Sequence, residues 1–157
     1  MIVINKIYVS ELGMDKITII DYNGESKTFS MGDIVRVDET NYQQEFIAQP
    51  AKYTYFANVL QSAKRVQAEQ EDLLAKLHGE LYNKAYNQLK DDGIKPTKDL
   101  IEAQIEQDDA YYKAKQRLAA AVESVGRANY LVKALEQRAQ MLQSYGADQR
   151  KDFKYGN

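Results

Sequence analysis

The sequence predicts a mainly α protein: a long antiparallel helical hairpin or coiled coil with a short N-terminal β-hairpin module, assembling into an oligomer. Two observations predict the helices, because apolar residues follow heptad spacing in two separate long stretches. A third predicts the β module, because β-branched residues flank an Asn-Gly pair near the N-terminus. The expected parts are a β module over residues 1–37, a helical domain over 38–147 and a charged flexible tail over 148–157.

The β module is predicted from short β-branched stretches in the first 37 residues. Residues 17–22 lead into Asn23-Gly24, and residues 25–29 follow it. This is a strong hairpin signal, because a type I′ turn requires positive φ at both central residues. Further strands are expected near residues 2–4 and over 34–37. Because these strands are few and short, they bury little apolar area. We therefore expect them to pack on the helices or on another subunit.

A first long helix is predicted over residues 51–89. From Phe56 to Leu81 the core positions follow one another at steps of 4 and 3, with glutamines in the middle of the series. Gly93 and Pro96 follow the helix, and proline cannot continue it.

Two capping residues are predicted after this turn. Thr97 is placed to cap a short helix that extends through Ile105. Asp108 or Asp109 is placed to cap the next helix, with a break between the two helices.

The last helix carries the most regular pattern in the sequence. Nine positions follow one another at steps of 4 and 3 without exception: Ala114, Leu118, Ala121, Val125, Ala128, Val132, Leu135, Ala139 and Leu142. A helix of roughly 35 residues is about 50 Å long and needs an equally long partner, which the first helix can supply by folding back. Tyr145-Gly146 is expected to end the helix, since glycine is favoured just past a helix end.

Composition limits the class of protein. Charged residues make up 28% and apolar residues 44%, and no apolar run is long enough to span a bilayer. The absence of cysteine excludes disulfides and thiolate chemistry. We therefore expect a soluble cytoplasmic protein. The net charge of −2 is uneven, because residues 91–109 are strongly acidic and residues 110–147 are basic.

Catalysis is not favoured by the residue pattern. His78 is the only histidine, and no nucleophile motif accompanies it. Adjacent carboxylates such as Asp91-Asp92 point to different helix faces and make poor acid–base pairs. The glycines form no phosphate-binding loop. We therefore expect a protein that is not an enzyme and that needs no cofactor or metal.

Basic residues on the helices indicate a nucleic-acid surface. On a helical wheel, Lys113, Arg117, Arg127 and Arg138 fall within about an 80° arc beside the apolar seam. The first helix adds Lys64, Arg65, Lys76 and Lys84, with the Tyr82 ring nearby. Binding of single-stranded DNA requires cations that hold the phosphates and, beside them, aromatic rings that stack on the bases. The same residues also suit ordinary solvated or salt-bridged helix faces, and that alternative stays open.

Two segments of the chain resemble a known family. Residues 37–45 (VDETNYQQE), followed by Tyr53-Thr54-Tyr55-Phe56 and a long polar helix, resemble the start of the UvsY-like family of phage recombination mediators. The segment from Tyr111-Tyr112 to Leu142 resembles that family's C-terminal long helix. The resemblance covers roughly residues 37–153, whereas residues 1–36 have no counterpart in the family. The family's basic Lys-x-Arg stretch in the first helix is also not reproduced.

The resemblance implies a specific function. Members of the family form an oligomeric ring, wrap single-stranded DNA on its surface and contact a recombinase and a single-strand-binding protein. They stabilise recombinase filaments in homologous recombination, DNA repair and recombination-dependent replication, without nucleotide or metal. The competing interpretation is a phage assembly chaperone, scaffold or coiled-coil adaptor that binds only proteins.

Overall fold

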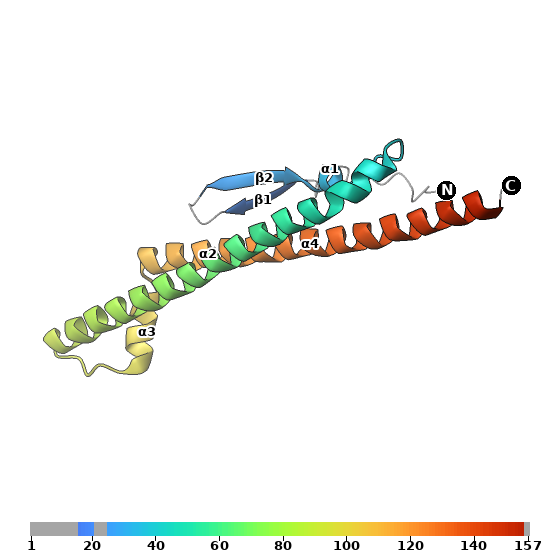
Figure 1. Cartoon of the computed structure of the whole chain (residues 1–157). Coiled ribbons are helices and arrows are strands. Elements are labelled where there is room, and N and C mark those ends of the chain that lie inside the picture. Colours follow the sequence, from blue (N-terminus) through green and yellow to red (C-terminus); the bar gives the residue numbers. More distant parts are fainter. Residues whose placement is uncertain (1–15, 21–24, 156–157) are drawn as a thin grey trace, which may run out of the picture. The chain divides into compact units, whose positions relative to one another are not determined.

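The computed structural model describes residues 16–20 and 25–155. The elements follow the order β1–β2–α1–α2–α3–α4, so the chain is mainly helical with one antiparallel strand pair near its N-terminus, as predicted (Figure 1). The residues fall into two compact units. The terminal unit contains Met1–Ala63 and Ser124–Asn157, and the central unit contains Lys64–Glu123.

The β hairpin belongs to the terminal unit. Strand β1 (Lys16–Ile20) pairs antiparallel with β2 (Ser26–Ser30), and Ile17 lies opposite Phe29. Ile17 is buried, and Phe29 packs edge-on against Phe56 of α2. The predicted pairing is therefore confirmed, although the Asn23-Gly24 turn and the strand expected near residues 2–4 lie outside the described residues.

The strand predicted over residues 34–37 is wrong. Helix α1 (Met31–Val35) covers the first half of that stretch, and residues 36 and 37 belong to no strand. The side chain of Ser30 caps it by accepting a hydrogen bond from the backbone N–H of Asp33, at 3.4 Å. The carboxylate of Asp33 also lies in the first turn, where the positive end of the helix favours it. These local interactions outweigh the β propensity of Ile34 and Val35, which instead pack against the core.

Helix α2 (Tyr42–Asp91) begins nine residues before the predicted start. Pro50 lies inside the helix. The segment before α2 is tied down, because the backbone N–H and hydroxyl of Thr40 both donate to Asp38 Oδ1. The backbone N–H of Asp38 donates in turn to the Glu45 carboxylate, at 3.2 Å. The hydrogen bonds from Thr40 lower the pKa of Asp38 below its ordinary value.

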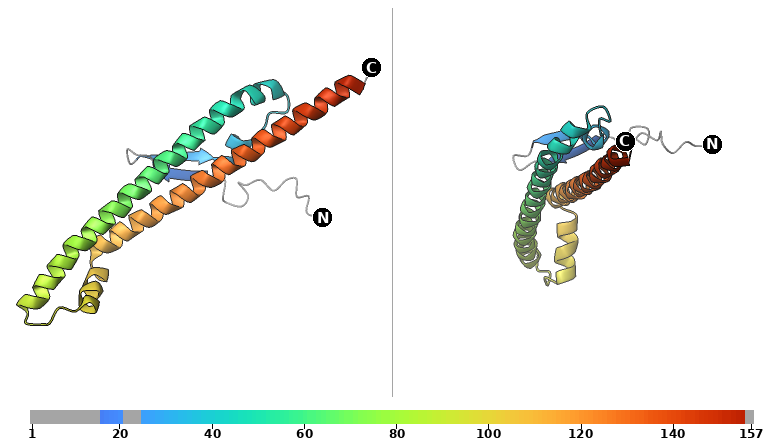
Figure 2. Two further views of the ribbon diagram at one scale, coloured as in Figure 1. Left: turned by 60° about the horizontal axis from the view of Figure 1, so that its bottom comes forward. Right: turned by 45° about the vertical axis from the view of Figure 1, so that its right-hand side comes forward.

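The core of the terminal unit lies between the first part of α2 and the second part of α4 (Asp109–Tyr155), which run side by side in Figures 1 and 2. The two segments are antiparallel, because Tyr42 stacks on Tyr145 whereas Phe56 belongs to the same cluster as Leu131. Leu131 and Leu135 are completely buried, and burial of one leucine side chain stabilises by about 1.5–3 kcal/mol.

Most residues of the predicted seam lie on the buried side of α4, but the centre of that side is shifted. Ala121, Ala128, Val132, Leu135 and Leu142 are buried within their units, whereas Leu118 and Val125 are half-buried. Three further positions are buried that the apolar pattern did not include: Ser124, Leu131 and Arg138. Together with Ala128, Leu135 and Leu142 they also follow steps of 4 and 3. A seam defined by apolar residues alone therefore missed a serine and an arginine.

In the central unit, helix α3 (Lys98–Glu106) packs against the last turns of α2 through Ala85, Leu89, Ile101 and Ile105. A Schellman motif ends α2: Ile94 N–H donates to Leu89 O, and Gly93 N–H donates to Lys90 O. Gly93 has φ +72°, as this motif requires.

Both predicted caps around α3 are confirmed. The side chain of Thr97 accepts from Leu100 N–H at 3.4 Å and starts α3. Asp108 starts α4, because its carboxylate accepts from the backbone N–H groups of Ala110 and Tyr111 at 2.8 and 3.0 Å.

The predicted end of the last helix at Tyr145-Gly146 is wrong. Helix α4 continues through Gly146 to Tyr155. The guanidinium of Arg150 donates to Gly146 O at 3.0 Å, and Gln149 donates to the Tyr145 hydroxyl at 3.1 Å. A glycine ends a helix only when it adopts a left-handed conformation, and Gly146 keeps the helical one.

Candidate nucleic-acid interface

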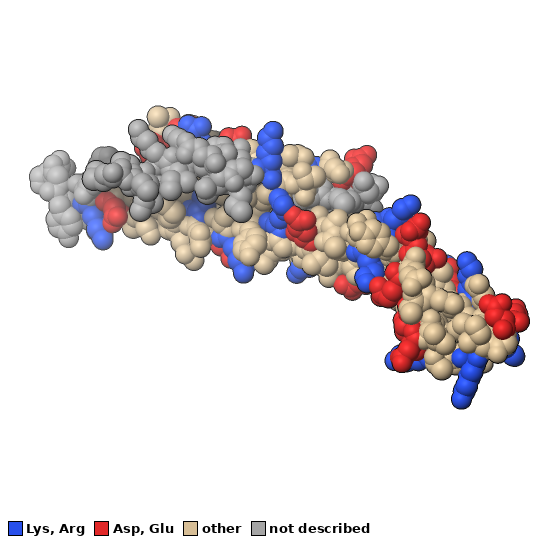
Figure 3. Space-filling model, turned by 180° about the vertical axis from the view of Figure 1, so that it is seen from behind, with Lys and Arg blue, Asp and Glu red and all other residues tan. Residues whose placement is uncertain are grey.

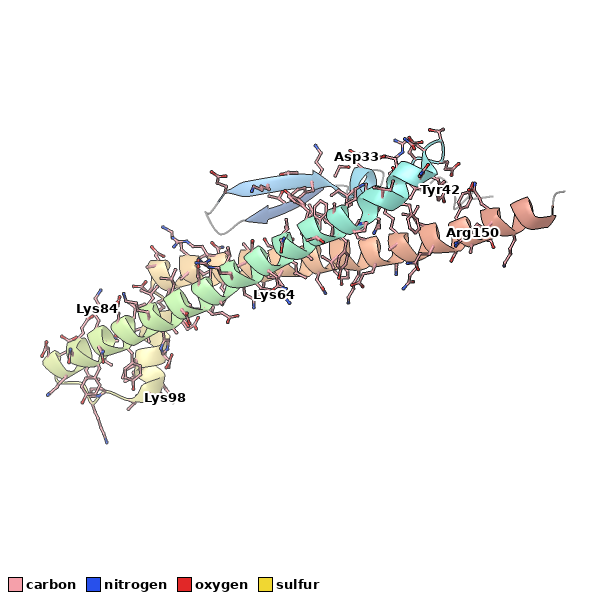
Figure 4. All side chains as sticks on the ribbon, in the orientation of Figure 1. Asp33, Tyr42, Lys64, Lys84, Lys98 and Arg150 are labelled. Carbon is pink, nitrogen blue, oxygen red and sulfur yellow. The ribbon has the colours of Figure 1, made fainter. Side chains whose placement is uncertain are left out.

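Four of the predicted cations lie on the part of α2 that belongs to the central unit. Lys64, Arg65, Lys76 and Lys84 are all exposed, and Figure 4 labels Lys64 and Lys84 on that helix. Arg65 pairs with Glu69 at 3.1 Å, and Lys76 approaches Glu80 at 4.0 Å. Exposed i,i+4 pairs of this kind contribute little to stability. A phosphate can therefore replace the carboxylate partner at small cost.

A groove in the central unit brings three of the predicted cations together. Lys76 of α2 and Lys113 and Arg117 of α4 line a groove of about 510 Å³. The apolar lining comes from both helices: Leu73, Leu77, Ala110 and Ala114. Glu80 and Asp109 also line the groove, so cations outnumber carboxylates by three to two. The arrangement suits an elongated anionic ligand with apolar faces.

Tyr82 lies in a different environment from the one predicted. Its ring is half-buried and packs against the cluster formed by α2 and α3. The His78 ring lies 6.3 Å away, centre to centre. Because one face of Tyr82 contributes to this packing, the ring is less accessible to a base than the sequence suggested.

Arg138 is the clear correction to the predicted interface. Its side chain is only 3% exposed. The guanidinium donates to the backbone carbonyls of Val35 and Arg36 and to the side chains of Gln49 and Glu45. On the helical wheel position 138 lies beside the apolar seam, but in the structure it lies within the buried side of α4. Arg138 therefore holds the terminal unit together and is not available to phosphates, whereas Arg127 is exposed.

His78 joins α2 to α3. Its Nε2 lies 3.0 Å from Glu102 Oε2, and both side chains are about one-third exposed. The nearby Lys115 pairs with Glu106 at 3.0 Å, and this hydrogen bond raises the pKa of Lys115 above its ordinary value. Within residues 16–20 and 25–155, no three His, Asp or Glu side chains gather where they could hold a metal ion.

A second groove lies in the terminal unit and is almost entirely apolar. Phe46, Pro50 and Tyr53 of α2 face Ala139 and Leu142 of α4 around a volume of about 360 Å³. Phe46 precedes the predicted helix start and was therefore not among the predicted core positions. Its step of 4 to Pro50 was the available signal.

Charges are mixed over much of the surface. In the face that Figure 3 shows, Lys and Arg side chains are interspersed with Asp and Glu side chains along the helices. No helix in the described part of the chain is long and apolar enough to cross a membrane. No protein-family model matches the chain, and comparisons with curated proteins and with solved structures found no significant match.

Proposed function

We propose that the protein is a recombination mediator, which binds single-stranded DNA and assists the loading of a recombinase in phage homologous recombination and recombination-dependent replication. The groove lined by Lys76, Lys113 and Arg117 carries the DNA-binding part of this proposal. Cations hold phosphates by releasing their counterions, and an apolar surface between the cations accommodates base faces.

The mediator part of the proposal is supported by the resemblance of residues 37–153 to UvsY-like proteins. It implies a recombinase and a single-strand-binding protein as partners and a homo-oligomer, with a ring as the expected form. Self-association is supported by large apolar side chains that remain exposed on the long helices. Ile47 and Met141 are 64% and 70% exposed. Contact with a second copy of the chain would remove these apolar side chains from water, which is favourable.

Titration of a fluorescent oligothymidine at several salt concentrations tests DNA binding by the groove. The triple variant Lys76→Ala/Lys113→Ala/Arg117→Ala removes the groove cations. Because each of these cations is expected to hold one phosphate of the single strand, the slope of log K against log salt should flatten by about 2.

The matched control is Lys90→Ala/Lys95→Ala/Lys98→Ala, which removes the same charge from exposed positions of the central unit outside the groove. It should leave the slope nearly unchanged. Equal decreases in both variants would show that only net charge matters. No binding by the parent protein at low salt would refute the proposal.

Recombinase loading tests the mediator role separately. Single-stranded DNA is first coated with a single-strand-binding protein, and recombinase filament formation is then followed with and without this protein. Faster filament formation with the parent protein, but not with the groove variant, is expected. DNA binding without any effect on loading would show that the protein binds DNA but is not a mediator.

The alternative is a structural adaptor or assembly chaperone that binds only proteins. The apolar groove around Phe46 and Leu142 favours it, because an apolar helix of a partner fits such a surface. The small net charge of −2 favours it as well. This alternative predicts the same oligomer with no affinity for nucleic acid.

A further inference from the structure

Tyr130 is an exposed aromatic residue that neither the seam nor the groove explains. It lies on α4 in the terminal unit, and 69% of its surface is accessible. Tyrosine usually packs at least one face of its ring against the protein, because the ring is largely apolar. A ring left this accessible is therefore available to stack on a ligand.

Two cations flank the ring along the helix. Arg127 lies three residues before Tyr130 and Lys133 three residues after it, and both are exposed. Residues three apart occupy neighbouring positions on a helix surface. Along the helix axis the two cations are about 9 Å apart, with the ring midway between them. Their long side chains can thus reach the two phosphates on either side of a single base.

The surface next to the ring is open. Gly126 and Ala134 lie four residues before and after Tyr130, where larger side chains would contact the ring. A Cβ atom added at Gly126 would meet no atom within 4 Å, so the space beside position 126 is open. Glycine in a helix costs about 1 kcal/mol relative to alanine, and no packing requirement at position 126 accounts for it.

Two carboxylates lie near the ring, and neither prevents a phosphate from binding Arg127 or Lys133. Glu136, six residues after Tyr130, accepts a hydrogen bond from the Tyr53 hydroxyl of α2 at 3.2 Å and is thus directed towards α2. Glu123 lies seven residues before the ring and four before Arg127, and it is exposed. An exposed carboxylate at that spacing stabilises a cation only weakly, so a phosphate can take its place.

We propose that Tyr130, Arg127 and Lys133 form a second single-stranded DNA contact, in which one base stacks on the Tyr130 ring and the adjacent phosphates bind the two cations. This inference rests on the proposed DNA-binding function and adds a stacking site in the terminal unit, separate from the groove of the central unit. Such a site recognises any base, since every base has a face that can stack.

The sequence contains no tryptophan, so Tyr130→Trp introduces a single indole fluorophore at the proposed site. Stacking of a base on the indole should quench its fluorescence during titration with oligothymidine. The matched control is Tyr112→Trp, because Tyr112 is on the same helix and is 60% exposed. Asp109 lies three residues before Tyr112, and Lys115 three residues after it is already paired with Glu106. No quenching is expected at position 112.

Affinity measurements complete the test. Tyr130→Ala should weaken oligothymidine binding by about 5- to 150-fold, the range found when a stacking ring is removed. Tyr130→Phe keeps the ring and should bind like the parent, as should Tyr112→Ala. Gly126→Leu should also weaken binding, because leucine covers the open side of the ring while favouring the helix.

Three outcomes separate the possibilities. If the parent binds oligothymidine but Tyr130→Ala binds equally well and Tyr130→Trp is not quenched, the stacking site is refuted and the proposed function stands. If the parent binds no DNA, both proposals fail. If Tyr130→Ala changes the oligomer size in light scattering and leaves DNA binding unchanged, the ring belongs to a subunit contact, and the stacking site is again refuted.

Discussion

Replacement of Arg138 by alanine should destabilise the terminal unit strongly, because the substitution leaves buried polar groups without partners. The Glu45 side chain, 20% exposed, loses the guanidinium that pairs with it. The buried Gln49 side chain loses a donor, and so do the carbonyls of Val35 and Arg36.

The magnitude follows from this geometry. Removal of one partner of a buried ion pair costs about 3–5 kcal/mol, and the partial exposure of Glu45 favours the lower end. For a chain of this length each kcal/mol lowers the melting temperature by about 2–4 °C. The expected decrease for Arg138→Ala is therefore roughly 6–12 °C.

Thermal and urea unfolding followed by circular dichroism provides the assay, at one fixed protein concentration because self-association would shift the midpoint. Arg127→Ala is the matched control, since Arg127 is exposed on the same helix and its removal should change stability by at most about 0.5 kcal/mol. The double variant Glu45→Gln/Arg138→Met should recover part of the stability, because no unpaired charge remains buried.

A result that refutes this reasoning is a decrease in stability of Arg138→Ala no larger than that of Arg127→Ala. A second is a decrease in DNA affinity of Arg138→Ala at unchanged stability. That result would place Arg138 on the surface, where the sequence pattern alone had placed it.

Two further predictions concern backbone conformation and pH. Gly93→Ala should destabilise by roughly 1–2 kcal/mol because Gly93 has φ +72°, whereas Gly79→Ala, inside α2 with open space around its Cβ, should stabilise by up to about 1 kcal/mol. Urea unfolding measures both, and changes of the same sign would contradict the argument. The hydrogen bond from Tyr53 to Glu136 raises the pKa of Tyr53 above its ordinary value of 10.0, so its stabilising effect is present below pH 10 and is lost as the pH rises through the folded-state pKa. The difference in unfolding midpoint between the parent and Tyr53→Phe should therefore shrink from pH 8 to pH 11, and a constant difference would show that this hydrogen bond does not contribute.

The sequence by itself determined the types of most elements, because these depend on neighbours along the chain. The antiparallel pairing of residues 16–20 with residues 26–30 follows from the β-branched residues on both sides of Asn23-Gly24. The caps at Thr97 and Asp108 follow from side chains that reach backbone N–H groups two or three residues ahead. The buried side of α4 follows from the heptad spacing of its apolar residues.

Local signals misled where longer-range packing opposed them. The predicted first helix began at residue 51, yet α2 begins at Tyr42, and Gln49 is buried and donates to Leu135 O of α4 at 2.8 Å. Gly146 suggested a helix end, yet the helix continues to Tyr155. A single residue's propensity amounts to about 1 kcal/mol for glycine, which contacts elsewhere in the chain can exceed.

Only the tertiary structure decided which cations remain available to a ligand. Lys113, Arg117 and Arg138 all belong to one predicted arc of α4, but the first two line a groove with Lys76 whereas Arg138 is buried. The helical wheel gives the direction of a side chain but not what lies opposite it. Arg138 is buried because Glu45, Gln49 and two backbone carbonyls, about 90 to 100 residues away in sequence, together satisfy its charge and its donors.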